Sequence, residues 1–189
     1  MLRKWLFRIA PKPRDPTDIA RWSDPASLDA AWDVRAKFAA GFVAPAARIL
    51  DLGCGAMALR HYLPPGCTYV GCDLVARDPE TIVCNLNAGE FPDEAARGCD
   101  VIVMLGLLGY VADVPALLRR IAEHKVEAIF AYVLGGQSKK THRVRLERAG
   151  WINSFTCEEL ERMLRASGFR TLRIESRIPG EVLFHVASR

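Results

Sequence analysis

Ile49-Leu-Asp51-Leu-Gly53-Cys-Gly55-Ala56 joins a short apolar run to an acid and two closely spaced glycines. The apolar run has the length of a buried strand, and the residues after it have the spacing of a short helix. Glycine has no Cβ, so the backbone can bend sharply there and a ligand can approach closely. Ligands of open α/β sheets bind at the carboxyl ends of the strands, so this segment predicts a ligand site at the turn.

Outward from this turn, strand and helix patterns alternate along the chain. Strands are predicted over 48–52, 68–72, 81–84, 100–104, 128–134, 170–175 and 182–187. Helices are predicted over 28–42, 56–63 and 115–124, and from the capping box at 156–159 to Gly168. The alternation predicts a Rossmann-like, doubly wound seven-stranded α/β sheet that is mostly parallel. A short turn at Pro179-Gly180 separates the last two strands, so one strand near the C-terminus must be antiparallel.

Two regions follow from this pattern. Residues 1–47 are interpreted as a helical lead-in or cap, and residues 48–189 as the ligand-binding domain. The first ten residues form a basic amphipathic stretch that is too short to be a stable helix alone. We expect it to dock on its own domain, on a partner or on a membrane surface, with its own domain favoured.

A second acid supports a nucleoside ligand. Asp73 ends the next predicted strand, 20 residues after Gly53. An acid at this place can accept hydrogen bonds from both hydroxyls of a ribose.

The same glycines also fit a dinucleotide fingerprint, because residues 53–58 read Gly-Cys-Gly-Ala-Met-Ala. Asp51 argues against that interpretation, since a carboxylate at the strand tip would repel a pyrophosphate. S-adenosylmethionine (SAM) carries an ammonium and a sulfonium at its methionine end, and a nearby acid is favourable to both. SAM is therefore favoured over a dinucleotide.

Asp51-Leu-Gly-Cys-Gly55 resembles the first motif of the class I SAM-dependent methyltransferases, and Asp73 resembles their ribose-binding acid. Later segments, at 84–87, 100–113 and 155–169, follow that family's order too. A weaker resemblance is to small methyltransferases of the MetW type and to those that modify sugars or lipids. The resemblance implies SAM as cofactor, S-adenosylhomocysteine (SAH) as product and a small-molecule acceptor. It implies a cofactor site at Asp51, Gly53, Cys54, Gly55, Asp73, Leu74, Asn85, Leu86 and Leu105, and the alternative for Asn85 is a turn. Arg35 lies on the predicted helix before the first strand and could bind the SAM carboxylate, with packing or surface charge as the alternative.

The chain departs from the family at two places. Met57 stands where a third glycine is common, and Gly109-Tyr110 stands where Glu-His is common after the fourth strand. Tyr110 and His142 are the candidate catalytic residues, and packing or surface roles are the alternatives for both. We expect Tyr110 and residues 135–151 to roof the acceptor site.

The net charge of +4 is concentrated in residues 1–14 and 139–148, while the rest of the chain is mildly acidic. The second basic stretch makes an anionic acceptor a natural candidate, with a solvated surface as the alternative. These stretches are too small to indicate nucleic-acid binding.

The six cysteines form no C-x-x-C pair, so structural thiols are expected and no metal site is. The absence of a signal-peptide pattern favours a cytoplasmic protein. Two other functions stay open, a non-catalytic SAM-fold binding module and, less favoured, an NAD(P)-dependent oxidoreductase.

Overall fold

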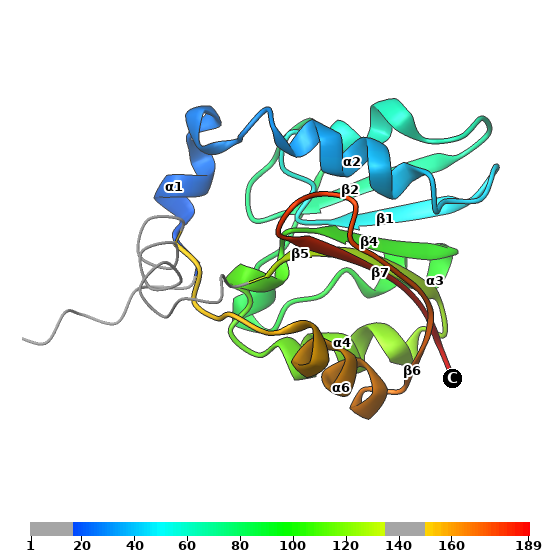
Figure 1. The fold of residues 1–189 in the computed structure, drawn as a ribbon. Coiled ribbons are helices and arrows are strands. Elements are labelled where there is room, and N and C mark those ends of the chain that lie inside the picture. The colour runs from blue at the N-terminus through cyan, green and yellow to red at the C-terminus, as the bar shows by residue number, and fades with distance from the viewer. Residues whose placement is uncertain (1–16, 135–149) are drawn as a thin grey trace, which may run out of the picture.

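A twisted seven-stranded sheet forms the middle layer of the computed structural model, which describes residues 17–134 and 150–189 (Figure 1). Its strands are β1 (Arg48–Leu52), β2 (Thr68–Asp73), β3 (Ile82–Val83), β4 (Val101–Leu105), β5 (Glu127–Val133), β6 (Phe169–Glu175) and β7 (Glu181–Ser188). They lie in the order β3-β2-β1-β4-β5-β7-β6. Strand β7 is antiparallel to both its neighbours, and the other adjacent pairs are parallel. The predicted fold is confirmed, including the single reversed strand.

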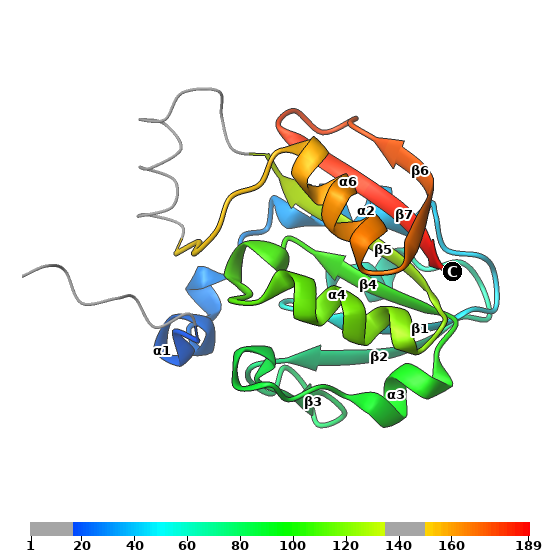
Figure 2. The same cartoon turned by 90° about the horizontal axis from the view of Figure 1, so that it is seen from below.

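Helices cover both faces of this sheet. The described α-helices are α1 (Ile19–Ser23), α2 (Trp32–Ala40), α3 (Asp93–Gly98), α4 (Val114–Glu123) and α6 (Cys157–Ala166). Short 3-10 helices are η1 (Pro25–Ser27), η2 (Ala58–Tyr62), η3 (Leu86–Ala88) and η4 (Leu108–Tyr110). Helix α2 lies over one face, and α4 and α6 lie side by side over the other (Figures 1 and 2). None of the helices within 17–134 and 150–189 is long and apolar enough to span a membrane.

The central strands are buried because each packs on both layers. Along β4, Ile102 and Met104 join the apolar cluster under α4 and α6, while Val101 and Val103 join the cluster under α2. Successive side chains of a strand point to opposite faces of the sheet. Because both faces are covered at β4, these side chains are buried and the strand is apolar throughout.

Helix α2 begins later than the sequence pattern predicts. The pattern predicts a helix over 28–42, but α2 covers Trp32–Ala40. Asp24 caps the 3-10 helix η1, and the Asp29 carboxylate accepts a hydrogen bond from the Ala31 amide at 2.9 Å. Local side-chain bonds of this kind compete with helix formation, so the chain stays irregular until Trp32.

The segment after the glycine turn is also tighter than predicted. In place of a helix over 56–63, the chain forms the 3-10 helix η2. Met57 adopts a left-handed conformation with φ 54° just before it, which prevents regular α-helix from starting at Ala56.

Candidate functional site

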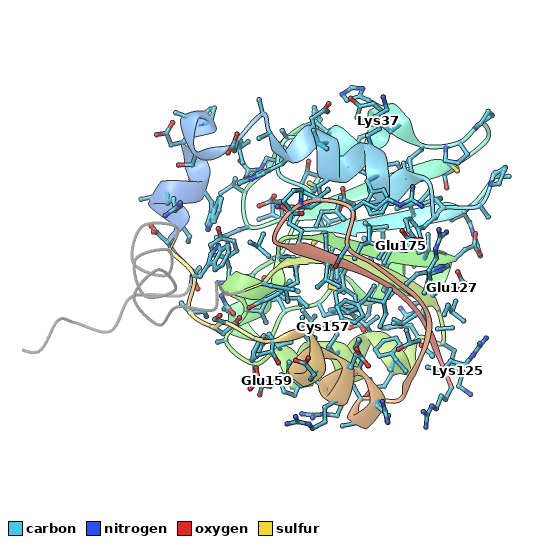
Figure 3. All side chains as sticks on the ribbon, viewed as in Figure 1. Lys37, Lys125, Glu127, Cys157, Glu159 and Glu175 are labelled. Atoms are coloured by element: carbon cyan, nitrogen blue, oxygen red, sulfur yellow. The ribbon has the colours of Figure 1, made fainter. Side chains whose placement is uncertain are left out.

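A cavity of about 340 Å³ lies at the carboxyl ends of β1, β2 and β4. Figure 3 shows Lys125 and Glu127 at the opposite end of the sheet, where β5 begins. The lining residues predicted from the sequence are Arg35, Gly53, Gly55, Asp73, Leu74, Asn85, Leu86, Leu105 and Tyr110. The cavity has the size of a small-molecule or cofactor site.

The glycine turn forms the floor between β1 and the cavity. Gly53 and Gly55 have φ values of +72° and +52°, which favour glycine. The Gly53 amide donates to the Cys72 carbonyl at 2.8 Å, which holds the turn against β2. A Cβ on Gly53 would lie 2.9 Å from the Cδ1 atom of Leu107, so no larger residue fits without movement.

Asp73 links the turn to the second strand. Its Oδ2 atom accepts from the Gly55 amide at 2.7 Å, and its Oδ1 atom accepts from the Leu74 amide at 2.7 Å and from Arg77 at 3.1 Å. A carboxylate has about four acceptor positions. Three are used, so Oδ2 retains room for one further donor such as a sugar hydroxyl.

Asp51 lies behind the turn and is not among the residues that line the cavity. The residue is 3 % exposed, and its carboxylate accepts a hydrogen bond from the Tyr69 hydroxyl at 2.8 Å. Burial raises the pKa of Asp51 to about 7, although the Tyr69 hydrogen bond opposes this shift. Cys54 is also buried and outside the lining, with its Sγ atom directed toward Gly71.

Beyond β3, Asn85 and Leu86 form the far wall. The Asn85 side-chain oxygen Oδ1 accepts from the Asn87 backbone amide at 3.1 Å and so caps η3. Cys84 hydrogen-bonds through its amide to the Asp73 carbonyl at 2.9 Å, which brings the two strand ends together.

Arg35 reaches the cavity from α2 and is already paired. Its guanidinium makes a bidentate ion pair with Glu181, with distances of 2.6 and 2.7 Å. A Cβ on Gly106 would lie 2.7 Å from the Nη1 atom of Arg35. The absence of a side chain at Gly106 therefore leaves space for the guanidinium at the end of β4.

Tyr110 joins three distant segments at the other side of the cavity. Its hydroxyl oxygen accepts from the Trp151 indole at 2.9 Å. Its ring meets that of Trp22 edge to face, with 4.9 Å between centroids. A Cβ on Gly109 would lie 3.4 Å from the Trp151 ring, so the departure to Gly109-Tyr110 makes room for this indole. Burial raises the pKa of Tyr110.

Two asparagines hold the backbone of this loop. The Asn87 side chain donates to the Tyr110 carbonyl at 2.9 Å and accepts from the Ala112 amide at 2.8 Å. The Asn153 side chain donates through Nδ2 to the backbone carbonyls of Leu108 and Val111, both at 2.9 Å. The loop is therefore fixed from both sides, and Tyr110 is held in one position.

Sequence reasoning missed several lining residues, among them Trp22, Leu28, Arg77 and Leu107. Arg77 follows Asp73 by four residues and forms an ion pair with it, a spacing that could have suggested the contact. Trp22 had no such signal, because it reaches the cavity only through tertiary contact. His142 and the basic stretch 139–148 lie outside the described residues.

Comparison with known proteins supports one interpretation of this site. A family model described as a methyltransferase domain matches residues 4–174, and thus crosses the boundary inferred at 47. No curated protein matches the chain.

Solved methyltransferase structures share the fold. A chain of the complex between the Haloferax volcanii Trm112 methyltransferase activator and the putative methyltransferase aligns with TM-score 0.70 and 18 % identity, covering 94 % of this chain and 99 % of that one. A SAM-dependent methyltransferase from Mesorhizobium loti aligns with a TM-score of 0.62 and 16 % sequence identity. The alignment covers 85 % of this chain and 99 % of that one.

A Haemonchus contortus phosphoethanolamine N-methyltransferase, in complex with phosphomonomethylethanolamine and SAH, aligns with a TM-score of 0.68 and 13 % sequence identity. The alignment covers 93 % of this chain and 59 % of that one. This chain therefore spans the full length of the two smaller proteins and about three fifths of the third. The sheet order, the glycine turn with its second-strand acid and the family match agree. The chain belongs to the methyltransferase-domain family, within the class I SAM-dependent methyltransferases.

Proposed function

We propose that the cavity binds SAM and that the protein transfers its methyl group to a small-molecule acceptor. The observation that carries this proposal is Asp73, a residue of the cavity wall that is 8 % exposed and whose carboxylate accepts a hydrogen bond from the Gly55 amide. An acid in this position suits a ribose hydroxyl, and the adjacent glycine backbone leaves space for the ligand.

The sheet order supports a division of the cavity between the nucleoside and the methionine part of SAM. Asp73, Leu74, Asn85 and Leu86 follow β2 and β3, so they would hold the nucleoside. Gly53, Gly55, Leu105 and Arg35 surround the ends of β1 and β4, so they would hold the methionine part. Arg35 would bind the SAM carboxylate. Asp51 would stabilise the positive charge of SAM from behind the turn, and Cys54 would contact the methionine part through its backbone.

The residues around Tyr110 would form the acceptor side. When bound, SAM supplies an activated methyl group on a sulfonium sulfur. The protein therefore mainly aligns the acceptor and excludes water. Tyr110 would position the acceptor, His142 would be available as a base where the acceptor must lose a proton, and the basic stretch 139–148 would favour an anionic acceptor.

Isothermal titration with SAM and SAH tests the cofactor assignment. Asp73→Asn should weaken SAH binding about thirtyfold, since a charged acceptor is worth about 2 kcal/mol. Asp100→Asn is the matched control, because Asp100 precedes β4 at the opposite end of the sheet. Unchanged affinity in a folded Asp73→Asn protein would contradict the assignment.

A further inference from the structure

Aromatic side chains from four separate segments form part of the cavity wall. They are Trp22 of α1, Trp32 of α2, Tyr110 after β4 and Trp151 before α6. Trp22 contacts two of the others, with ring centroids 4.9 Å from Tyr110 and 6.5 Å from Trp32. Trp151 adds the 2.9 Å hydrogen bond to the Tyr110 hydroxyl.

The aromatic wall and the polar groups assigned to the nucleoside follow different strands, and Arg77 and Asn87 link the two regions. Asp73 and Asn85 follow β2 and β3, whereas Tyr110 follows β4, on the other side of β1 in the sheet. If SAM binds as proposed above, the aromatic wall is available to the acceptor. The inference therefore rests on the proposed function.

Charge decides which kind of acceptor such a wall suits. Aromatic rings can surround a cation, but Arg21 also lines this part of the cavity, and its guanidinium lies 5.2 Å from the centroid of the Trp22 ring. Arg21 favours the ionised form of Tyr110, so its positive field reaches the hydroxyl, whereas the charge of Arg35 is balanced by Glu181. An ammonium acceptor would meet this field unfavourably, whereas a flat ring with an oxygen anion would be stabilised by it.

The Tyr110 hydroxyl supplies the polar contact. It accepts a hydrogen bond from Trp151, and within residues 17–134 and 150–189 its own proton has no acceptor. That proton can therefore be donated to a ligand oxygen beside the aromatic rings.

We propose that the acceptor is a hydroxyaryl compound, which stacks against Trp22 and Trp151 and receives a hydrogen bond from Tyr110 on its reacting oxygen. The hydroxyl loses its proton to bulk water before the acceptor is enclosed in the cavity. The oxygen lone pair then forms the bond to the methyl carbon while the carbon–sulfur bond breaks. Sulfur keeps the electron pair, which leaves the thioether SAH and an aryl methyl ether.

A matched pair of probes separates an aromatic site from a merely polar one. The probes are 4-hydroxybenzoate and trans-4-hydroxycyclohexanecarboxylate, which carry the same groups on a flat and on a saturated ring. Binding to the SAH-saturated protein is measured by saturation-transfer NMR and titration. We expect 4-hydroxybenzoate to bind at least about tenfold more tightly, since stacking on two rings adds to its affinity.

Single-residue variants then test which side chains contact the bound 4-hydroxybenzoate. Trp22→Leu and Trp151→Leu should each weaken 4-hydroxybenzoate binding about fivefold. Phe42→Leu is the control, because Phe42 packs beside His185 and does not line the cavity. Tyr110→Phe keeps the ring and should weaken binding of 4-hydroxybenzoate but not of benzoate, which tests the hydrogen bond even if a tryptophan variant fails to fold.

Equal affinity for the two probes, or tighter binding of benzyltrimethylammonium than of 4-hydroxybenzoate, would overturn the hydroxyaryl proposal. Failure of SAH itself to bind would instead remove the proposed function on which the inference rests. The two failures are distinguished because SAH binding is measured first and without an acceptor.

Discussion

At the residue scale, Asp51 has an unusual role for a carboxylate. It is buried behind the Gly53–Gly55 turn, and its pKa is raised to about 7, first by burial. The protonated form is therefore substantially populated near neutral pH. A ligand that brings positive charge to the turn must favour the ionised form, so binding and proton release become linked.

This linkage gives a prediction with a definite sign. The ionised fraction of a group with a pKa of 7 rises about tenfold between pH 6 and pH 8, and SAM affinity should follow it upward by up to about tenfold. Titration calorimetry in two buffers of different ionisation enthalpy should show proton release on SAM binding near pH 7.

Asp51→Asn is the reference, because it keeps an acceptor for the Tyr69 hydroxyl and removes the titration. The ligand's own amine titrates as well, so the difference between the wild type and this variant is the quantity to compare. Identical pH profiles for the two proteins would show that Asp51 does not sense the ligand.

At the element scale, Arg77 anchors α1 to the second strand. Its guanidinium donates to the Trp22 carbonyl at 2.8 Å and to Asp73 at 3.1 Å, and its side chain is 9 % exposed. A single buried group therefore joins the carboxylate proposed for the ribose to the helix that carries one aromatic wall residue. A planar guanidinium can make both bonds at once, and an ammonium cannot match that geometry.

Arg77→Lys should loosen α1 while leaving the sheet intact. Loss of one such hydrogen bond, worth about 1 kcal/mol, should speed hydrogen exchange of the amides of residues 19–24 about fivefold. Arg97→Lys, on the exposed side of α3, is the matched control. Unchanged exchange at 19–24 would mean that other contacts hold the helix.

The capping box of α6 is the clearest case of a sequence signal with a local physical cause. The Thr156 hydroxyl accepts from the Glu159 amide at 3.2 Å, and the Glu159 carboxylate accepts from the Thr156 amide at 2.8 Å. Figure 3 labels Glu159 at the start of this helix. Two amides that the helix cannot satisfy are thus satisfied by neighbouring side chains.

Thr156→Ala should lower the free energy of unfolding by about 1 kcal/mol, because it removes the hydroxyl that caps α6. Thr156→Ser retains a hydroxyl and should stay close to the wild type. Urea denaturation followed by circular dichroism measures both, and an equal loss in the two variants would point to packing of the threonine methyl instead.

At the scale of the whole molecule, the basic amphipathic residues 1–10 remain a prediction, since they lie outside the described residues. We expect them to dock on their own domain, so the protein should stay in the supernatant when sedimented with anionic vesicles. Sedimentation that is lost at high salt and on deletion of residues 1–10 would show a membrane surface instead.

The parts of the fold that depend on local chemistry were predictable from the sequence. The apolar strand with two glycines, the acid 20 residues later and the capping box each express a constraint within a few residues. The reversed strand followed as well, because the turn before β7 is too short for a parallel return. Boundaries such as the start of α2 were less predictable, since the Asp29 side chain competes with the helix there.

Tertiary structure alone decided what surrounds the ligand site. Asp51 was expected at the ligand, yet it is buried behind the turn, because its exposure depends on β2 and Tyr69 packing against it. Arg35 pairs with Glu181, 146 residues away, and Trp22, Tyr110 and Trp151 meet from three distant segments. Local patterns specify strands, turns and caps. Contacts between distant side chains depend on how the layers pack, and no short segment encodes that arrangement.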